Sequence, residues 1–214
     1  MIAKEGYPII GGTLLIVLAL AAGAYFTGSL TLEILTGVFI ALTFFHLYFF
    51  RDPVRPVPEG EKLIISPADG HVVKIEEVDE PLYFKEKVRK VSIFLSVFDV
   101  HVNRMPIAGE VDFVDYRPGR FLAAFADDAS DHNEQSVIGV RSDHGRVLFK
   151  QIAGLIARRI IYYSRVGDQV KPGERMGLIR YGSRIDMFFP LDVEVKVKLK
   201  QRVRCGASVI GEFP

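Results

Sequence analysis

With 214 residues, the chain is long enough for one catalytic domain and a smaller appendage. Its formal net charge of +1 gives no electrostatic reason to expect a nucleic-acid partner. Hydrophobic residues make up 49% of the chain although 25% are charged, which is typical of a polar domain joined to a very apolar segment. Cys205 is the only cysteine, which excludes an intrachain disulfide and a multi-cysteine metal site, and we expect no metal cofactor.

Residues 1–50 are predicted to form a membrane-associated helical hairpin. Residues 9–50 contain one charged side chain, Glu33, and Thr27-Gly28-Ser29 divides them into two pieces. Each piece is near the lower limit of about 17–25 residues for a membrane span. A cleaved signal peptide, or one span followed by a half-buried helix, are the alternatives.

Basic residues flank this apolar segment on both sides. Lys4 precedes it, and Arg51 and Arg55 follow it. Because positive charge is enriched in cytoplasmic loops, we expect both ends of the hairpin at the cytoplasmic face of the cell membrane. The rest of the chain would then lie on that side.

Residues 51–61 contain several prolines and are predicted to be an extended linker. From residue 62 the pattern changes to strands, so residues 62–214 are expected to form a compact, mostly β domain of the α+β class. Asp69-Gly70 lies between two strand-like runs and predicts a hairpin turn.

Polar side chains alternate in the segment that follows the apolar run 91–96. Asp99, His101 and Asn103 are predicted to share one face of a strand. Such a row lines a pocket or, alternatively, forms a solvated face of a sheet. Arg104, next in the sequence, stays protonated and cannot act as a base, but it can bind a phosphate or a carboxylate.

Residues 116–143 are rich in Gly, Asp and Ser and are expected to form a long surface excursion. Within them, Phe121–Ala126 is an apolar patch that either packs on the core or contacts lipid.

The last fifty residues contain a faint internal repeat, in which residues 169–177 resemble residues 202–211. Two copies of strand, glycine turn and strand are similar to the halves of a biotinyl/lipoyl-like β sandwich. Neither turn carries the lysine that such a carrier domain would modify, so a carrier role is not expected.

Gly182-Ser183 lies between the two copies, in a predicted tight loop that leads into a strand. The bond is either part of an ordinary turn or a site of self-cleavage, in which the Ser183 hydroxyl attacks the Gly182 carbonyl. Glycine favours the second role because it tolerates a strained backbone that exposes its carbonyl. Ala207-Ser208 is a weaker candidate, because alanine lacks this freedom and cleavage there would release only a short tail.

Four motifs together resemble the phosphatidylserine decarboxylase family in its short form, which includes archaetidylserine decarboxylase-like proteins. They are Phe-Phe-Arg-Asp-Pro (49–53), Ser-Pro-Ala-Asp-Gly (66–70), Phe-Asp-Val-His-Val-Asn-Arg-Met-Pro (98–106) and Gly-Ser-Arg-Ile-Asp (182–186). The resemblance extends from about Phe49 to the C-terminus.

The resemblance implies a proenzyme that cleaves itself after Gly182 and converts Ser183 into a pyruvoyl group. A β-subunit part (62–182) and an α-subunit part (183–214) would stay together as a heterodimer, and a homo-oligomer is an open alternative. Asp69 matches the family's aspartate for self-processing, and His101 matches a histidine linked to decarboxylation. Arg104 stands where longer members have a second histidine, so His101 serves both steps or Asp69 acts largely without a histidine.

A pyruvoyl ketone would bind the substrate amine as a Schiff base and accept the electrons released with CO2. Pyridoxal phosphate is not expected, because the sequence shows no glycine-rich phosphate-binding loop linked to a candidate lysine. The expected reaction converts phosphatidylserine to phosphatidylethanolamine in phospholipid biosynthesis. Asp99 and Asp186 are supporting candidates, Asp186 by orienting the loop or by a structural role. The alternatives are a decarboxylase of archaetidylserine or another serine-headed lipid, a decarboxylase of another amine, and a non-catalytic membrane-anchored scaffold.

Overall fold

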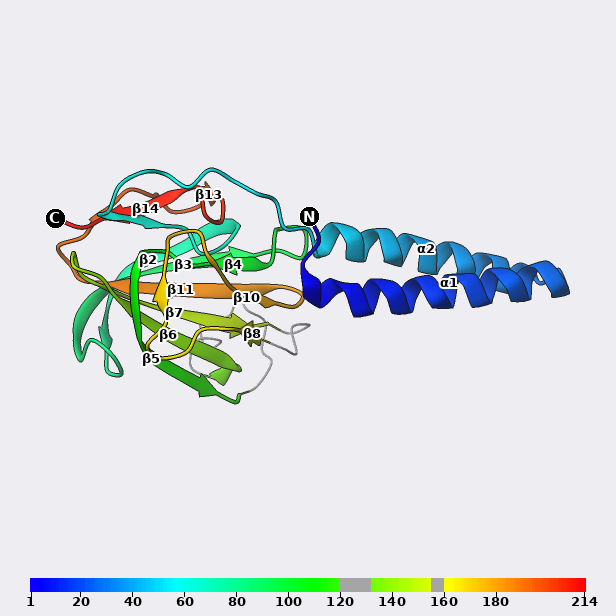
Figure 1. Cartoon of the computed structure of the whole chain (residues 1–214), viewed down its shortest axis with the longest axis horizontal. Coiled ribbons are helices and arrows are strands. Elements are labelled where there is room, and N and C mark those ends of the chain that lie inside the picture. Colours follow the sequence, from blue (N-terminus) through cyan, green and yellow to red (C-terminus); the bar gives the residue numbers. More distant parts are fainter. Residues whose placement is uncertain (120–131, 155–159) are drawn as a thin grey trace. The chain divides into compact units, whose positions relative to one another are not determined.

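A computed structural model describes residues 1–119, 132–154 and 160–214. The chain divides into two compact units, residues 1–54 and residues 55–214. The first consists of helices and the second mostly of strands (Figure 1). This confirms the prediction of a mostly β protein with an N-terminal helical hairpin.

The helical unit contains a short 3-10 helix, η1 (Lys4–Gly6), and two long helices, α1 (Tyr7–Thr27) and α2 (Leu30–Phe49). Gly28 ends α1 in the left-handed conformation, with φ of 61°, and its N–H donates to the Ala24 carbonyl at 2.8 Å. The helices pair along their length, and many apolar side chains on them are exposed, including Phe26 and Phe44. Both helices are long and apolar enough to cross a membrane.

The second unit is built from strands β1 to β14. Their bounds are β1 Leu63–Ile65, β2 Gly70–Glu80, β3 Glu86–Leu95, β4 Val102–Arg104, β5 Gly109–Arg117, β6 Gln135–Arg141, β7 Arg146–Ala153, β8 Ile160–Tyr162, β9 Gln169–Val170, β10 Arg175–Ile179, β11 Ser183–Phe189, β12 Glu194–Val195, β13 Arg202–Val203 and β14 Val209–Glu212.

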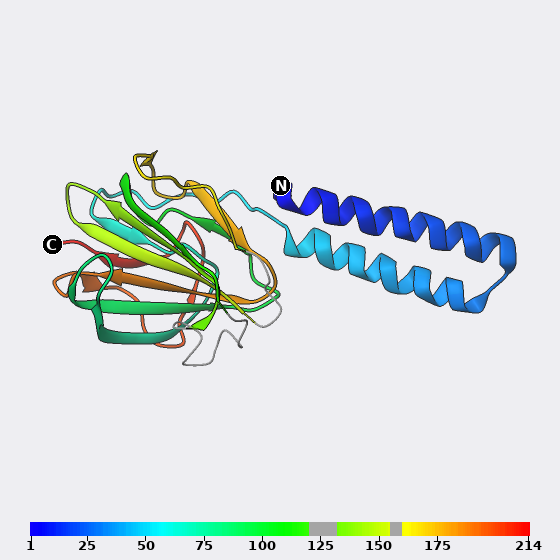
Figure 2. The same cartoon turned by 90° about the horizontal axis from the view of Figure 1, so that it is seen from below.

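The main sheet has eight antiparallel strands in the order β13-β2-β3-β11-β7-β6-β5-β9. Figure 1 labels most of these strands, and Figure 2 shows the same strands from below. Two three-stranded sheets accompany it, with orders β1-β14-β12 and β4-β10-β8. Strand β11 is central, because it pairs with β3 on one side and β7 on the other over nearly its whole length.

Alternation along β11 places its side chains on two different faces. Ile185, Met187 and Phe189 enter the main apolar core, whereas Phe188 packs in a smaller cluster on the other face. Ser183 shares the core-facing side with Ile185. The first residue of the central strand is therefore carried into the interior.

The predicted hairpin at Asp69-Gly70 is wrong. Strand β1 pairs with β14, whereas β2 pairs with β3 and β13, so the chain crosses between two sheets at this point. A Cβ at Gly70 would lie 2.1 Å from the Phe94 carbonyl oxygen, so the glycine serves a close approach of two backbones. Asp69 is bound by distant residues rather than by a local turn.

The prediction that residues 116–143 form a surface excursion is wrong for the part after β5 that the structure describes. Residues 135–141 form β6, a buried strand inside the main sheet. The strand begins with the polar residues Gln135 and Ser136, so its sequence did not have the apolar pattern expected of a buried strand. The apolar patch Phe121–Ala126 lies outside the described residues.

The two copies of the faint repeat each form strand, glycine turn and strand. Gly173 and Gly206 both have left-handed backbones, with φ of 77° and 72°. The two turns also meet, because a Cβ on Gly206 would lie 3.1 Å from Cδ of Arg104 and 4.0 Å from Cα of Gly173. The repeat therefore brings two distant turns together beside β4.

Candidate active site

The Gly182-Ser183 bond lies in a short loop between β10 and β11. Tyr181 and Gly182 are both left-handed, with φ of 59° and 76°, and Ser183 is the first residue of β11. A left-handed backbone is costly for Tyr181 but not for glycine. The loop thus holds one strained residue, Tyr181, two positions before the serine. Burial raises the pKa of the Tyr181 phenol above its ordinary value.

The Ser183 hydroxyl is buried but makes no hydrogen bond to any residue that the structure describes. A buried hydroxyl normally has a partner, and leaving one without costs about 1–3 kcal/mol. Ser183 pairs with Leu95 of β3 and Ala153 of β7, so its backbone is firmly placed. The arrangement suits a nucleophile better than a structural serine.

His101 contacts the loop directly. Its Nδ1 lies 3.0 Å from the Asp99 carbonyl oxygen, and its Nε2 accepts a hydrogen bond of 3.1 Å from the Gly182 N–H. The first contact requires Nδ1 to carry the proton, which leaves the Nε2 lone pair facing the loop. The imidazole is fully buried and therefore holds an acceptor beside the Gly182-Ser183 bond.

Asn103 is also fully buried, and its side chain is hydrogen-bonded to β7. Its Oδ1 accepts a 2.8 Å hydrogen bond from Nε2 of Gln151, whose Oε1 accepts a 2.6 Å bond from the Ser136 hydroxyl. The predicted strand with Asp99, His101 and Asn103 on one face is wrong, because β4 begins at Val102 and Asn103 is the only one of the three within it. Gln151 and Ser136 were not identified from the sequence, although each is a polar residue inside an apolar strand.

Asp69 is bound by residues far away in the sequence. Arg55 holds both carboxylate oxygens, with one of the two contacts at 2.8 Å, and the Cys205 N–H donates to Oδ1 at 2.7 Å. The Cys205 thiol in turn lies 3.4 Å from the Val102 carbonyl oxygen, next to His101. Asp69 is therefore linked through Cys205 to Val102, the first residue of β4, which directly follows His101.

Asp99, Arg104 and Asp186 are located around the site but do different things. Asp99 lies in the turn before β4, where its carboxylate accepts from the Ser96 N–H and hydroxyl and from Arg202. The Arg104 guanidinium donates to the Gly173 carbonyl at 2.9 Å.

Asp186 is on the opposite face of β11 from Ser183. It is paired with Arg184, at 2.9 Å between Nε of the arginine and Oδ1 of the aspartate, and both side chains are buried.

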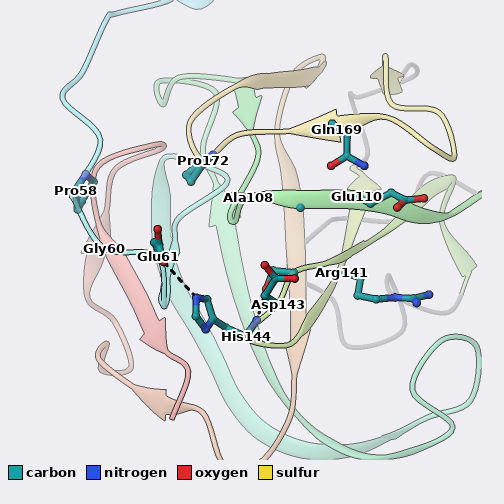
Figure 3. A pocket seen from close by; sticks show the side chains of 12 residues that line it. Pro58, Gly60, Glu61, Ala108, Glu110, Arg141, Asp143, His144, Gln169 and Pro172 are labelled. Carbon is teal, nitrogen blue, oxygen red and sulfur yellow. Dashed lines mark hydrogen bonds and ion pairs between the residues drawn. The ribbon is translucent and has the colours of Figure 1, made fainter.

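A separate cleft lies away from these residues. It is lined by Glu61, Glu110, Arg141 and His144 among others, and Glu61 and His144 are 3.7 Å apart (Figure 3). None of the predicted site residues lines it. Among the described residues, no cluster of three His, Cys, Asp or Glu side chains is arranged to hold a metal ion.

Comparisons with known proteins assign the chain to a family. A family model described as phosphatidylserine decarboxylase matches residues 42–211. The phosphatidylserine decarboxylase proenzyme of Symbiobacterium thermophilum is 46% identical over 100% of this chain and 96% of its own length. The proenzymes of Syntrophotalea carbinolica and Desulfotalea psychrophila are 47% and 42% identical, over 98% and 99% of this chain and 95% and 96% of their own lengths. The chain belongs to the phosphatidylserine decarboxylase family, as the four sequence motifs predicted.

Proposed function

We propose that this protein decarboxylates phosphatidylserine to phosphatidylethanolamine, after cleaving itself between Gly182 and Ser183. One observation carries the proposal: a buried serine hydroxyl without a partner among the described residues follows a left-handed glycine whose N–H contacts His101. The family and the names of its relatives supply the substrate.

Self-cleavage begins with attack of the Ser183 oxygen on the Gly182 carbonyl carbon. His101 accepts the hydroxyl proton at Nε2, once this nitrogen exchanges its bond with the Gly182 N–H for one with the hydroxyl. The C–N bond then breaks, its nitrogen takes up a proton, and an ester joins Gly182 to the Ser183 oxygen. Loss of the Ser183 α-proton expels the Gly182 carboxylate, and water replaces the remaining nitrogen, which leaves as ammonia.

The buried start of β11 fits the resulting pyruvoyl group. The Ser183 side chain, from which the group would form, is buried, and its hydroxyl makes no hydrogen bond to a described residue. When formed, such a group supplies a carbonyl that binds the substrate amine and accepts the electrons released with CO2. In this proposal His101 holds and returns a proton there, a role that its contact with Gly182 supports. Asp69 acts through Cys205 and β4, and binding of the lipid's anionic groups by Arg104 stays a prediction.

The pairing of the strands supports a stable heterodimer of the two fragments. After cleavage, β11 would still be hydrogen-bonded between β3 and β7, β13 to β2, and β14 to β1. All three strands belong to the smaller fragment, and their partners belong to the larger one. Separation of the fragments would therefore break the central sheet.

The apolar helices α1 and α2 favour association with the membrane that contains the lipid substrate. Basic residues on both sides of the hairpin support placing the catalytic unit on the cytoplasmic side. An ether-linked serine lipid has the same head group, so archaetidylserine is the second candidate substrate.

Release of CO2 from vesicles tests the activity. Vesicles with diacyl phosphatidylserine, ether-linked phosphatidylserine or phosphatidylcholine alone are incubated with the wild-type protein and with Ser183→Ala. We expect CO2 only from the serine lipids and only with the wild type. Equal CO2 release by Ser183→Ala would refute the assigned role of Ser183, and no release by the wild type would favour the non-catalytic scaffold.

A further inference from the structure

A row of buried polar side chains crosses the core from β6 to β4. The Ser136 hydroxyl donates to Oε1 of Gln151, and Nε2 of Gln151 donates to Oδ1 of Asn103. All three side chains are fully buried. In this row every hydrogen bond points the same way, so its last donor is the Asn103 amide nitrogen.

Asn103 Nδ2 makes no hydrogen bond within the described part of the chain. An unsatisfied buried donor costs about 1–3 kcal/mol, and a native protein retains one where it serves a purpose. Ser183 Oγ is one of several other buried side-chain atoms without such a bond among the described residues.

The two atoms belong to one region of the fold. Gln151, which binds Asn103, lies opposite Ile185 in the β7–β11 pair, and Ser183 is the next core-facing residue of β11, about 7 Å along the strand. His101, two residues before Asn103, contacts Gly182. Within residues 101–103, His101 therefore contacts the loop before Ser183, and Asn103 contacts β7, the strand beside it.

We propose that Asn103 donates through Nδ2 to the oxyanion that forms on the Gly182 carbonyl oxygen during self-cleavage. This inference rests on the proposed cleavage at Gly182-Ser183. As the Ser183 oxygen bonds to the carbonyl carbon, an electron pair moves to the carbonyl oxygen, and a fixed donor lowers the energy of that charge. Gln151 and Ser136 are positioning residues, because their bonds determine which side of the Asn103 amide faces the site.

With these two roles on different residues, self-cleavage needs only one histidine at the site. His101 supplies the acceptor for the serine proton, and Asn103 supplies the donor for the developing charge. Arg104 takes neither role, because its guanidinium donates to a backbone carbonyl of the repeat turn. The proposed catalytic pair is therefore His101 and Asn103, two residues apart in one segment.

The rate of cleavage during cell-free synthesis with vesicles tests the proposal, because it follows the chain before any decarboxylation. Asn103→Asp keeps the acceptor for Gln151 but replaces the donor with a negatively charged oxygen. Loss of one oxyanion donor slows a reaction about 10²–10³-fold. We expect at least this loss in Asn103→Asp, a similar loss in Asn103→Ala, and a smaller one in Ser136→Ala.

Hydroxylamine identifies the affected step, since it cuts an ester but not an amide. If ester formation is slow, hydroxylamine will not restore cleavage of the Asn103 variants. Val88→Ala, in the small apolar cluster on the other sheet face, matches them for loss of stability and should cleave at the wild-type rate. Thermal unfolding confirms that each variant is folded.

Two outcomes would overturn the inference. Cleavage of both folded Asn103 variants at the wild-type rate would remove the donor role while leaving the proposed function intact, and rapid scission of either variant by hydroxylamine would show that Asn103 acts after ester formation. Failure of the wild-type chain to cleave would instead refute the proposed self-cleavage and this inference with it.

Discussion

Gly182 donates its backbone N–H to Nε2 of His101, which is 81 residues earlier in the chain, at 3.1 Å. This contact joins the β4 segment to the loop before the central strand. Because Nδ1 is engaged by the Asp99 carbonyl, the imidazole presents an acceptor rather than a donor to the loop. The single histidine of the motif therefore contacts the residue whose carbonyl group is proposed to be attacked.

Replacing His101 with alanine should slow both self-cleavage and decarboxylation. A positioned general base or acid contributes about 10²–10⁴-fold to a rate, so a loss in that range is expected for each step that uses it. Time courses of fragment formation and of CO2 release measure the two steps separately. Wild-type rates for both would exclude His101 from the site, whereas loss of one alone would assign it to that step.

Breaking the Arg55–Asp69 pair should impair self-cleavage without removing a reacting group. Arg55→Ala leaves the Asp69 carboxylate with the Cys205 N–H, and a hydrogen bond to a charged group contributes about 1.5–3 kcal/mol. We expect lower stability by about this amount and slower fragment formation. Arg55→Lys should recover part of both, because lysine keeps the charge but cannot form the two-pronged contact. Normal cleavage by Arg55→Ala would show that the pair is not needed at the site.

Substituting alanine for Gly182 should slow cleavage through the backbone rather than by steric exclusion. A Cβ there would be 3.7 Å from a Val97 methyl group, an ordinary contact, but φ of 76° is unfavourable for alanine by about 1–2 kcal/mol. If the left-handed loop is the reactive form, the rate should fall by roughly tenfold, since 1.4 kcal/mol is a factor of ten. An unchanged rate would mean that cleavage proceeds from another loop conformation.

The Arg184–Asp186 pair should behave as a buried structural unit. Both side chains are almost fully buried, and Asp186→Ala leaves the Arg184 charge without this partner, at a cost of about 3–5 kcal/mol. The double variant Arg184→Met, Asp186→Leu should lose much less stability because no charge stays buried. Chemical denaturation of the wild type and the two variants compares their stabilities. A double variant as unstable as the single one would argue against this assignment.

Much of the fold follows from local patterns in the sequence. The apolar run interrupted at Gly28 specifies two helices, and the glycine turns at 173 and 206 mark both copies of the repeat. Strand pairing does not follow, because it depends on contacts between distant segments. Asp69-Gly70 has the sequence of a hairpin turn, but β1 before it pairs with β14, more than a hundred residues away, and β2 after it pairs with β3 and with the distant β13.

The sequence motifs named Ser183, Gly182 and His101 as candidates, and the structure brings His101 to the Gly182 N–H, while the roles of all three stay predictions. Gln151 and Ser136 could not be added, because their role depends on β6 and β7 lying side by side in the core. The binding of Asp69 by Arg55 likewise joins a linker residue to the domain, and no local pattern indicates it.

Intact mass spectrometry of the denatured wild-type protein, beside Ser183→Ala, tests the central claim most directly. We predict two wild-type fragments, residues 1–182 and 183–214, with the smaller one beginning in a pyruvoyl group and lighter than the corresponding serine peptide by the loss of ammonia. Ser183→Ala should give one full-length mass. A single full-length mass for an active wild-type protein, or cleavage of Ser183→Ala at the same bond, would contradict the account.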